Sequence, residues 1–374
     1  MAHAYTPGLK VAEFSDIEKL RRLPLLGEVL VNLKDRVSAT QLVARTELPG
    51  KVYPMNVAGE LGLNKADELP QFMLKKEGES VKKGDLIALK KGFFGLFKSE
   101  FYSPVDGTLD QISKLSGQVV FSELPIPVEI NAYVEGNIDQ VIDKEGVVVK
   151  TQGVHIQGIL GLGGEKYGEI KMAVSSSNQL VDIADIKPEY KGKIIICGSR
   201  ITSEALNKAK EIGVIGVVVG GFDYQDIRNI LGNDLGVAIT GHENIGLTLI
   251  LTEGFGTIPM ADRTFKLMTK YEGKMASING ATQIRAGVMR PEIIIVHNEK
   301  PDESGSKNYA ESGIEPGDLI RVIRSPYFGK IGKVKSLPSE LHKVESGTWV
   351  RVLIAEIDGN DVLIPRANIE VLEK

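Results

Sequence analysis

The sequence predicts a multidomain protein that is mainly β, with one small α/β unit near its middle. Residues 25–122 contain short strand-like segments separated by charged and glycine-containing turns. Residues 193–271 alternate strand and helix patterns, and residues 314–374 return to short strands. With 374 residues, the chain is long enough for two or three domains with sizeable cores.

Composition excludes several classes of protein. Hydrophobic residues make up 42% and charged residues 25%, which is ordinary for globular proteins. A net charge of -4 argues against a surface coated in basic residues for nucleic acid. The single cysteine, Cys197, excludes a disulfide framework within one chain. The first residues show no basic stretch followed by an apolar core, and no apolar run is long enough to span a membrane. We therefore expect a cytoplasmic protein.

Two linked signals stand in the N-terminal third. The first is residues 77–88, with a tight Lys83-Gly84-Asp85 turn, and the second is residues 103–109, which read Ser-Pro-Val-Asp-Gly-Thr-Leu. A fainter copy of the first signal lies at residues 33–44. This region resembles the barrel-sandwich hybrid of lipoyl and biotinyl domains, and loosely that of the RnfC electron-transport subunits. The resemblance implies the fold; the RnfC clusters need cysteines that this sequence lacks.

Lipoyl and biotinyl domains carry an acceptor lysine at a hairpin tip, and this sequence offers no equivalent. In the matching residues 89–100, neither Lys90, Lys91 nor Lys98 stands in an acceptor context. We therefore expect no prosthetic group and no other cofactor. The hairpin instead carries three phenylalanines, which predict a buried contact with a neighbouring domain or a partner-binding surface. These residues are Phe93, Phe94 and Phe97.

The α/β unit is predicted from three strands, at residues 193–197, 214–219 and 247–251, and from three helices. The helices are expected at residues 202–212, from Asp223 onward, and at 261–271. This order resembles swivelling domains of the protease-associated kind, a likeness of fold that implies no activity. Two glycine-rich loops are weak candidates for binding an anion or small molecule, although Glu253 would repel phosphate and tight packing explains them better. Their glycines are Gly220, Gly221, Gly254 and Gly256.

Domain boundaries follow from these patterns. We predict a barrel-sandwich hybrid over residues 1–125, and a β segment plus the α/β unit over residues 126–297. The dipeptide Asn279-Gly280 predicts a tight hairpin between residues 275–278 and 281–284. Residues 298–313 are polar and predict a linker before a last module at 314–374.

The C-terminal module resembles a KOW motif in an SH3-like barrel, on the strength of residues 315–334 and the later strands. Such modules imply contact with RNA, the ribosome or polymerase. Residues 314–374, however, contain nine Lys or Arg and nine Asp or Glu, which offers little phosphate neutralisation. We therefore favour protein contact and leave RNA open. The candidate contact residues are Arg321, Arg324, Tyr327, Phe328 and Lys330.

No catalytic constellation is legible, and the five histidines lack the spacing of metal ligands. We therefore expect a non-catalytic scaffold or adaptor that docks onto a larger protein or ribonucleoprotein assembly. The alternative is an enzyme or enzyme subunit with a small-molecule site in the α/β unit. Whether the chain forms oligomers is open.

Overall fold

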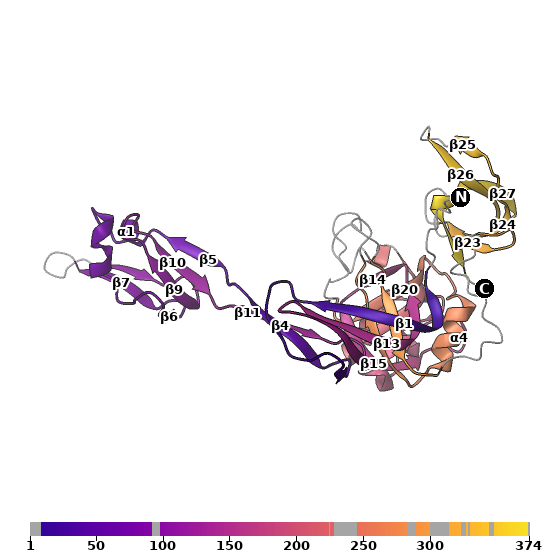
Figure 1. Ribbon diagram of the computed structural model, residues 1–374, viewed down its shortest axis with the longest axis horizontal. Helices are drawn as coiled ribbons and strands as arrows, with labels where there is room; N and C mark the ends of the chain where they lie inside the picture. The colour runs from indigo at the N-terminus through magenta and orange to yellow at the C-terminus, as the bar shows by residue number, and fades with distance from the viewer. Residues whose placement is uncertain are drawn as a thin grey trace.

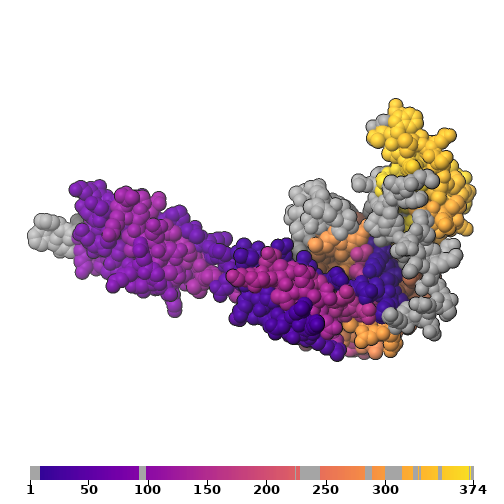
Figure 2. All heavy atoms as spheres, in the orientation of Figure 1, coloured from indigo at the N-terminus to yellow at the C-terminus, as the bar shows by residue number. Residues whose placement is uncertain are grey.

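The computed structural model describes residues 9–91, 98–223, 225–227, 245–282, 289–299, 314–322, 327, 330–343 and 348–372. Its elements are mostly strands, which confirms the expected mainly β organisation with a small α/β unit. The molecule is elongated: a small module projects from one end of a central body, and the C-terminal module lies at the other end (Figure 1, Figure 2).

The body is built on a 13-stranded sheet whose main path is β14-β20-β19-β17-β15-β21-β22-β13-β12-β3. Helix α2 (Ser203–Ile212) and helix α4 (Asp262–Lys270) contribute to two different cores, one on each side of the parallel strands. Both helices lie within one residue of their predicted bounds, and the Thr202 hydroxyl caps α2. Most of the helix predicted from Asp223 onward lies outside the described residues. The strands of this part are β14 (Leu160–Leu162), β15 (Glu165–Met172), β17 (Ile194–Ile196), β19 (Gly216–Phe222), β20 (Thr248–Phe255), β21 (Met275–Asn279) and β22 (Glu292–Val296).

The connection after β21 differs from the predicted tight turn. Strand β21 does pair antiparallel with a following strand, but that partner is β22, with Asn279 opposite Glu292. The Asn279 side chain accepts the N–H of Ala281 at 2.9 Å, and Gly280 packs against the backbone of Leu162. Residues 279–281 thus form a local turn, but the strand that pairs with β21 lies farther along the chain than predicted.

Strands on both sides of residue 125 pair with one another. Strand β1 (Val11–Arg22) runs antiparallel along β13 (Gly146–Gln157) for most of its length. Strand β3 (Arg36–Val37) pairs with β12 (Gly136–Ile142), and β4 (Leu42–Leu48) pairs with β11 (Ile126–Asn131). A division at residue 125 would separate these partners. We call residues 28–48 together with 126–150 the proximal module.

Residues 50–125 form a separate unit, the distal module. Its strands β5 (Val52–Met55), β10 (Val119–Glu123), β9 (Gly107–Ile112) and β6 (Ser80–Val81) form one sheet, and β7 (Leu86–Lys91) with β8 (Lys98–Tyr102) forms a hairpin. Its core contains residues of this segment alone, whereas the proximal core contains none of them. The ribbon of β4 and β11 carries the distal module away from the body (Figure 1).

The two modules repeat the same backbone contacts. The N–H of Gly78 donates to the Leu109 carbonyl at 2.7 Å, and the N–H of Lys34 donates to the Ile138 carbonyl at 2.8 Å. Gly78 and Lys34 both have positive φ, 83° and 71°. The faint copy at residues 33–44 is therefore a structural repeat.

The repeat extends to irregularities of pairing. Each module has one β-bulge in its hairpin ribbon and one in its second strand pair, at matching positions. The hairpin partners are Leu42 with Asn131 and Ala44 with Ile130 in the proximal module, and Leu86 with Tyr102 and Ala88 with Phe101 in the distal module. The second set is Ile138 with Val149 and Gln140 with Val148, matched by Leu109 with Phe121 and Gln111 with Val120.

These correspondences define a nested duplication. In the distal module, β7 and β8 are joined through residues 92–97. In the proximal module, the equivalent strands β4 and β11 are joined through the whole distal module. One module is thus inserted at the hairpin position of the other.

The C-terminal module has its own six-stranded sheet, in the order β25-β26-β24-β23-β28 with β27 paired to β26. Its core is likewise separate from those of the body. The turn at Asp358 and Gly359 has positive φ at both residues, as a two-residue hairpin requires. The strands are β23 (Leu319–Val322), β24 (Ile331–Ser336), β25 (Leu341–Lys343), β26 (Trp349–Ile357), β27 (Asn360–Pro365) and β28 (Ile369–Leu372).

We predict that the matching glycines Gly107 and Gly136 are both sensitive to substitution. A Cβ at Gly107 would collide with the Ser122 carbonyl, and one at Gly136 with the Lys150 carbonyl. Either change to alanine should lower the free energy of unfolding by about 1–3 kcal/mol, because backbone must move. Urea unfolding measures this. Gly164→Ala, which meets no atom within 4 Å, is the control; equal stability of all three variants would contradict the prediction.

Candidate functional site

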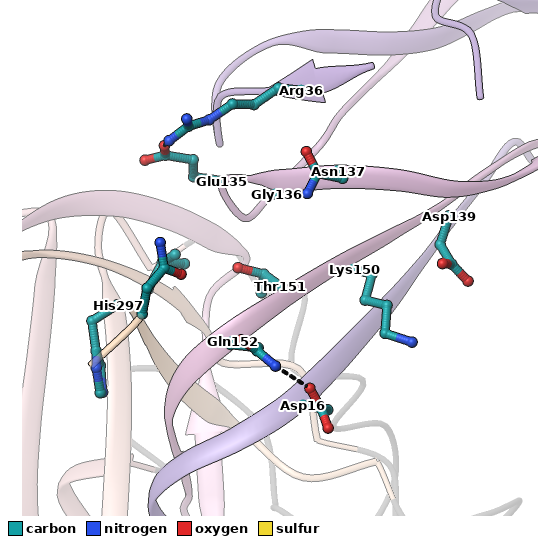
Figure 3. Close-up of a pocket in the computed structure, with 12 residues that line it drawn as sticks. Asp16, Arg36, Glu135, Gly136, Asn137, Asp139, Lys150, Thr151, Gln152 and His297 are labelled. Carbon is teal, nitrogen blue, oxygen red and sulfur yellow. Dashed lines mark hydrogen bonds and ion pairs between the residues drawn. The ribbon is translucent and has the colours of Figure 1, made fainter. Parts of the chain in front are cut away.

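A groove lies where strands β12 and β22 separate along the edge of β13. Strand β1 covers one edge of β13, so β12 and β22 share the other edge, at residues 146–150 and 153–157 respectively. Strands β12 and β22 separate at Thr151 and Gln152, and the space between the two strands is a groove of about 490 Å³ (Figure 3). It is lined by Asp16, Arg36, Glu135, Gly136, Asn137, Asp139, Lys150, Thr151, Gln152, Val296, His297 and Asn298.

Charged groups of this groove are largely paired with one another. Arg36 donates to Glu135 at 2.7 Å, and the Gln152 amide donates to Asp16 at 2.7 Å. Lys150 lies 3.3 Å from Glu18 outside the lining, and that contact raises the pKa of Lys150. The lining contains three carboxylates and two cationic side chains. The groove therefore offers hydrogen bonds to a polar ligand, without a strong charge of either sign.

His297 is held in the groove wall. Its Nε2 lies 3.1 Å from the Tyr271 hydroxyl and 2.9 Å from the Glu13 carbonyl, and its ring stacks on Tyr271 with centroids 5.0 Å apart. Thr151 is the one Ser, Thr or Cys among the lining residues. No nucleophile activated by a base is formed by the described lining residues.

A buried ionic cluster joins three strands of the 13-stranded sheet. The Glu292 carboxylate accepts Lys19 Nζ at 2.6 and 2.5 Å and lies 2.9 Å from His155 Nε2. Burial alone would raise the pKa of Glu292, but the His155 hydrogen bond and the Lys19 charge outweigh it and lower the pKa below its usual value. These residues come from β1, β13 and β22. None of the three was singled out from the sequence, because their contacts cross the whole chain.

Tyr133 packs beside this cluster, in the proximal module. Its φ is 70°, its backbone carbonyl accepts the Ser277 hydroxyl, and its own hydroxyl has no hydrogen-bond partner in the described part of the chain. Burial raises the pKa of Tyr133 well above its usual value. Arg21 lies over the Tyr133 ring at 5.3 Å and pairs with Glu165 at 2.6 Å. Through its ring and its carbonyl, Tyr133 thus connects the proximal module to Arg21 on β1 and Ser277 on β21.

The candidate glycines are engaged in backbone packing. The N–H of Gly220 donates to Gly198 at 2.9 Å, that of Gly221 to Ser199 at 3.1 Å, and that of Gly256 to Phe222 at 2.9 Å. A Cβ at Gly220 or Gly221 would collide with the backbone of residues 256–260, and Gly254 and Gly256 have positive φ, 139° and 100°. Close approach of two backbone segments therefore accounts for Gly220 and Gly221, and positive φ accounts for Gly254 and Gly256.

The other sequence candidates are dispersed. Arg321 is buried and forms an ion pair with Glu253 of the body. Lys330 pairs with Asp358 in its own module, and Tyr327 packs against the module's core. Phe93, Phe94, Phe97, Arg324 and Phe328 lie outside the described residues. The strands that flank the three phenylalanines, β7 and β8, lie in the module farthest from the body (Figure 1).

Cys197 and the lysines near the distal hairpin are surrounded by, or lie opposite, other residues of the chain. The Cys197 thiol is fully buried, and burial raises its pKa far above the usual value, so it is no thiolate nucleophile. Lys90 Nζ donates to the Gly62 carbonyl at 2.6 Å, and Lys91 is paired across the ladder with Lys98.

No known protein family matches this chain, and a search of curated proteins finds no significant relative. Among the residues that the structure describes, no group of three or more His, Cys, Asp or Glu is placed to hold a metal ion. Within the same ranges, no helix combines the length and apolar character needed to cross a membrane.

Proposed function

We propose that this chain is a non-catalytic scaffold or adaptor that docks onto a larger protein or ribonucleoprotein assembly. The observation that carries the proposal is the nested duplication, which holds the distal module away from the body on the ribbon of β4 and β11 (Figure 1). An adaptor uses the distance to reach a partner.

The distal hairpin is the proposed contact point. Its sequence between Lys91 and Lys98 is Gly-Phe-Phe-Gly-Leu-Phe, and aromatic side chains commonly anchor protein interfaces. The resemblance to barrel-sandwich hybrids supports the same conclusion, because those modules function by presenting this hairpin. The KOW-like character of the C-terminal module adds a second proposed contact, with protein favoured over RNA by its balanced charge.

The alternative function, an enzyme with a small-molecule site in the α/β unit, has weaker support. The backbone N–H groups of Gly220, Gly221 and Gly256, which would have to bind an anion, already donate to carbonyls of the chain. A ligand that binds the folded state raises its melting temperature. A reproducible rise with a phosphorylated metabolite, lost when Gly220 or Gly256 is changed, would favour the enzyme over the adaptor.

A hairpin replacement tests the adaptor proposal. Residues 92–97 are replaced by Asn-Gly, and the tagged variant and the original chain are each purified from the native organism. We expect proteins that co-purify with the original chain to be lost with the variant. Leu115→Ser is the control, because Leu115 is 97% exposed on the same module but outside the hairpin. An unchanged set of co-purifying proteins in the hairpin variant would overturn the assignment of the hairpin.

A further inference from the structure

A buried ion pair crosses the boundary between the C-terminal module and the body. Arg321 on β23 is 2% exposed, and its guanidinium pairs with the carboxylate of Glu253 on β20, which is 4% exposed. The other Glu253 oxygen accepts the N–H of Ala261 at 2.9 Å, at the start of α4. Glu253 is therefore oriented by the body before the C-terminal module contacts it.

Apolar packing around this ion pair is incomplete. A small cavity of about 40 Å³ lies beside it, lined by Leu9 and Val11 of the body and by Val371 of the C-terminal module, among others. The C-terminal module has a core of its own that shares no residue with the body. The boundary between the modules thus contains a buried charged pair with unfilled space beside it.

Such a boundary favours one arrangement of the two modules but adds little net stability to it. Transferring two charges out of water costs nearly as much as their attraction returns, so a buried pair adds little net stability. Removing one partner, in contrast, strands a buried charge and is strongly unfavourable. The pair therefore selects one docked arrangement and depends on both residues.

We propose that Arg321 and Glu253 form an intramolecular latch that holds the C-terminal module against the body and keeps Arg321 from any external partner. This proposal concerns the chain's own modules and goes beyond the proposed adaptor function. Two states follow from it. In the docked state Arg321 is occupied by Glu253, and in the released state Arg321 is exposed to acidic or phosphate groups.

Distances between spin labels measure the two states in the full chain. Cys197 is fully buried, so labels attach selectively to cysteines introduced at the exposed positions Lys187 in the body and Glu340 in the C-terminal module. We expect one narrow distance distribution in the otherwise unchanged chain. In Glu253→Gln and in Arg321→Met, the ratio of docked to released molecules should fall by about tenfold or more. Glutamine can still accept the Ala261 N–H.

The controls separate release from unfolding. Glu356→Gln removes a carboxylate that pairs with Lys335 on the surface of the C-terminal module, and it should leave the distribution narrow. Circular dichroism melting identifies any variant that has lost its fold. The two test variants alter different modules, so a folding failure in one leaves the other decisive. A narrow, unshifted distribution in a folded Glu253→Gln or Arg321→Met variant would overturn the latch.

Discussion

Replacement of residues 49–125 by an Asn-Gly turn is expected to leave a folded protein that contains the proximal module, the body and the C-terminal module. Leu48 and Ile126 are paired at the end of the ribbon of β4 and β11, so a two-residue turn can join them. The proximal core contains no residue from the excised segment. The shortened chain should unfold cooperatively, with a melting temperature close to that of the parent body.

Two measurements check this excision. Differential scanning calorimetry reports whether a cooperative transition remains, and small-angle scattering should show a marked reduction in maximum dimension because the projecting module is gone (Figure 2). The matched control is the Asn-Gly replacement of residues 92–97, which shortens the equivalent hairpin without removing a core. Loss of cooperative unfolding in the 49–125 replacement alone would show that the nested modules depend on each other.

Glu292→Gln is expected to be the most damaging single substitution in the ionic cluster. The change leaves Lys19, whose side chain is only 20% exposed, without its carboxylate partner. Removing one member of a buried pair typically costs about 3–5 kcal/mol. Urea unfolding at neutral pH measures the loss. The exposed pair of Glu272 and Lys171, 2.8 Å apart, provides the control, since Glu272→Gln should cost less than about 1 kcal/mol.

The same substitution should change the dependence of stability on pH. The pKa of Glu292 is lower in the folded protein than its usual value of 4.5, so this carboxylate stabilises the fold above pH 4.5. That contribution is lost as pH falls through the lower, folded-state pKa. We therefore expect the difference in stability between the original chain and Glu292→Gln to be constant near neutral pH and to shrink in acid. A difference that grows in acid would contradict the assigned direction.

Local structure was largely predictable from the chain. The bounds of α2 and α4 follow from apolar spacing, the Thr202 cap and Gly213, which has φ 86° in the structure. The Lys83-Gly84-Asp85 turn and the turn at Asp358 and Gly359 also follow from residue type. Each of these features depends on interactions over a few residues, which are visible in a linear reading.

Only half of the nested duplication can be detected in the sequence. Residues 33–44 resemble residues 77–88 in sequence, but the second half of the copy has no comparable similarity. Its residues 132–138 read Ala-Tyr-Val-Glu-Gly-Asn-Ile, against Ser-Pro-Val-Asp-Gly-Thr-Leu at 103–109. Side chains differ at most of these positions, and what the copies share is the backbone: a glycine packed on a neighbouring carbonyl and the same bulge. A comparison of glycine positions could have found it.

Candidate sites show the same limit. The sequence shows glycines at the ends of β19 and β20. It does not show that their N–H groups donate to the backbone carbonyls of residues 198–199 and of Phe222. In the sequence, Arg321 belongs to a basic stretch, but its burial against Glu253 depends on how the C-terminal module meets the body. For the glycines and for Arg321 alike, the contacting residues are not near in the sequence.

Residue type and short-range spacing are enough to predict the mainly β class, helices α2 and α4, the turns at residues 83–85 and 358–359, and the absence of a cysteine framework. Which strands share a sheet, where the distal module is inserted and which charges are buried together follow only from the folded arrangement. Those features arise from contacts between residues far apart in the chain, such as Lys19 with Glu292 and Glu253 with Arg321. Burial makes the loss of one partner costly, and burial exists only after the chain has folded.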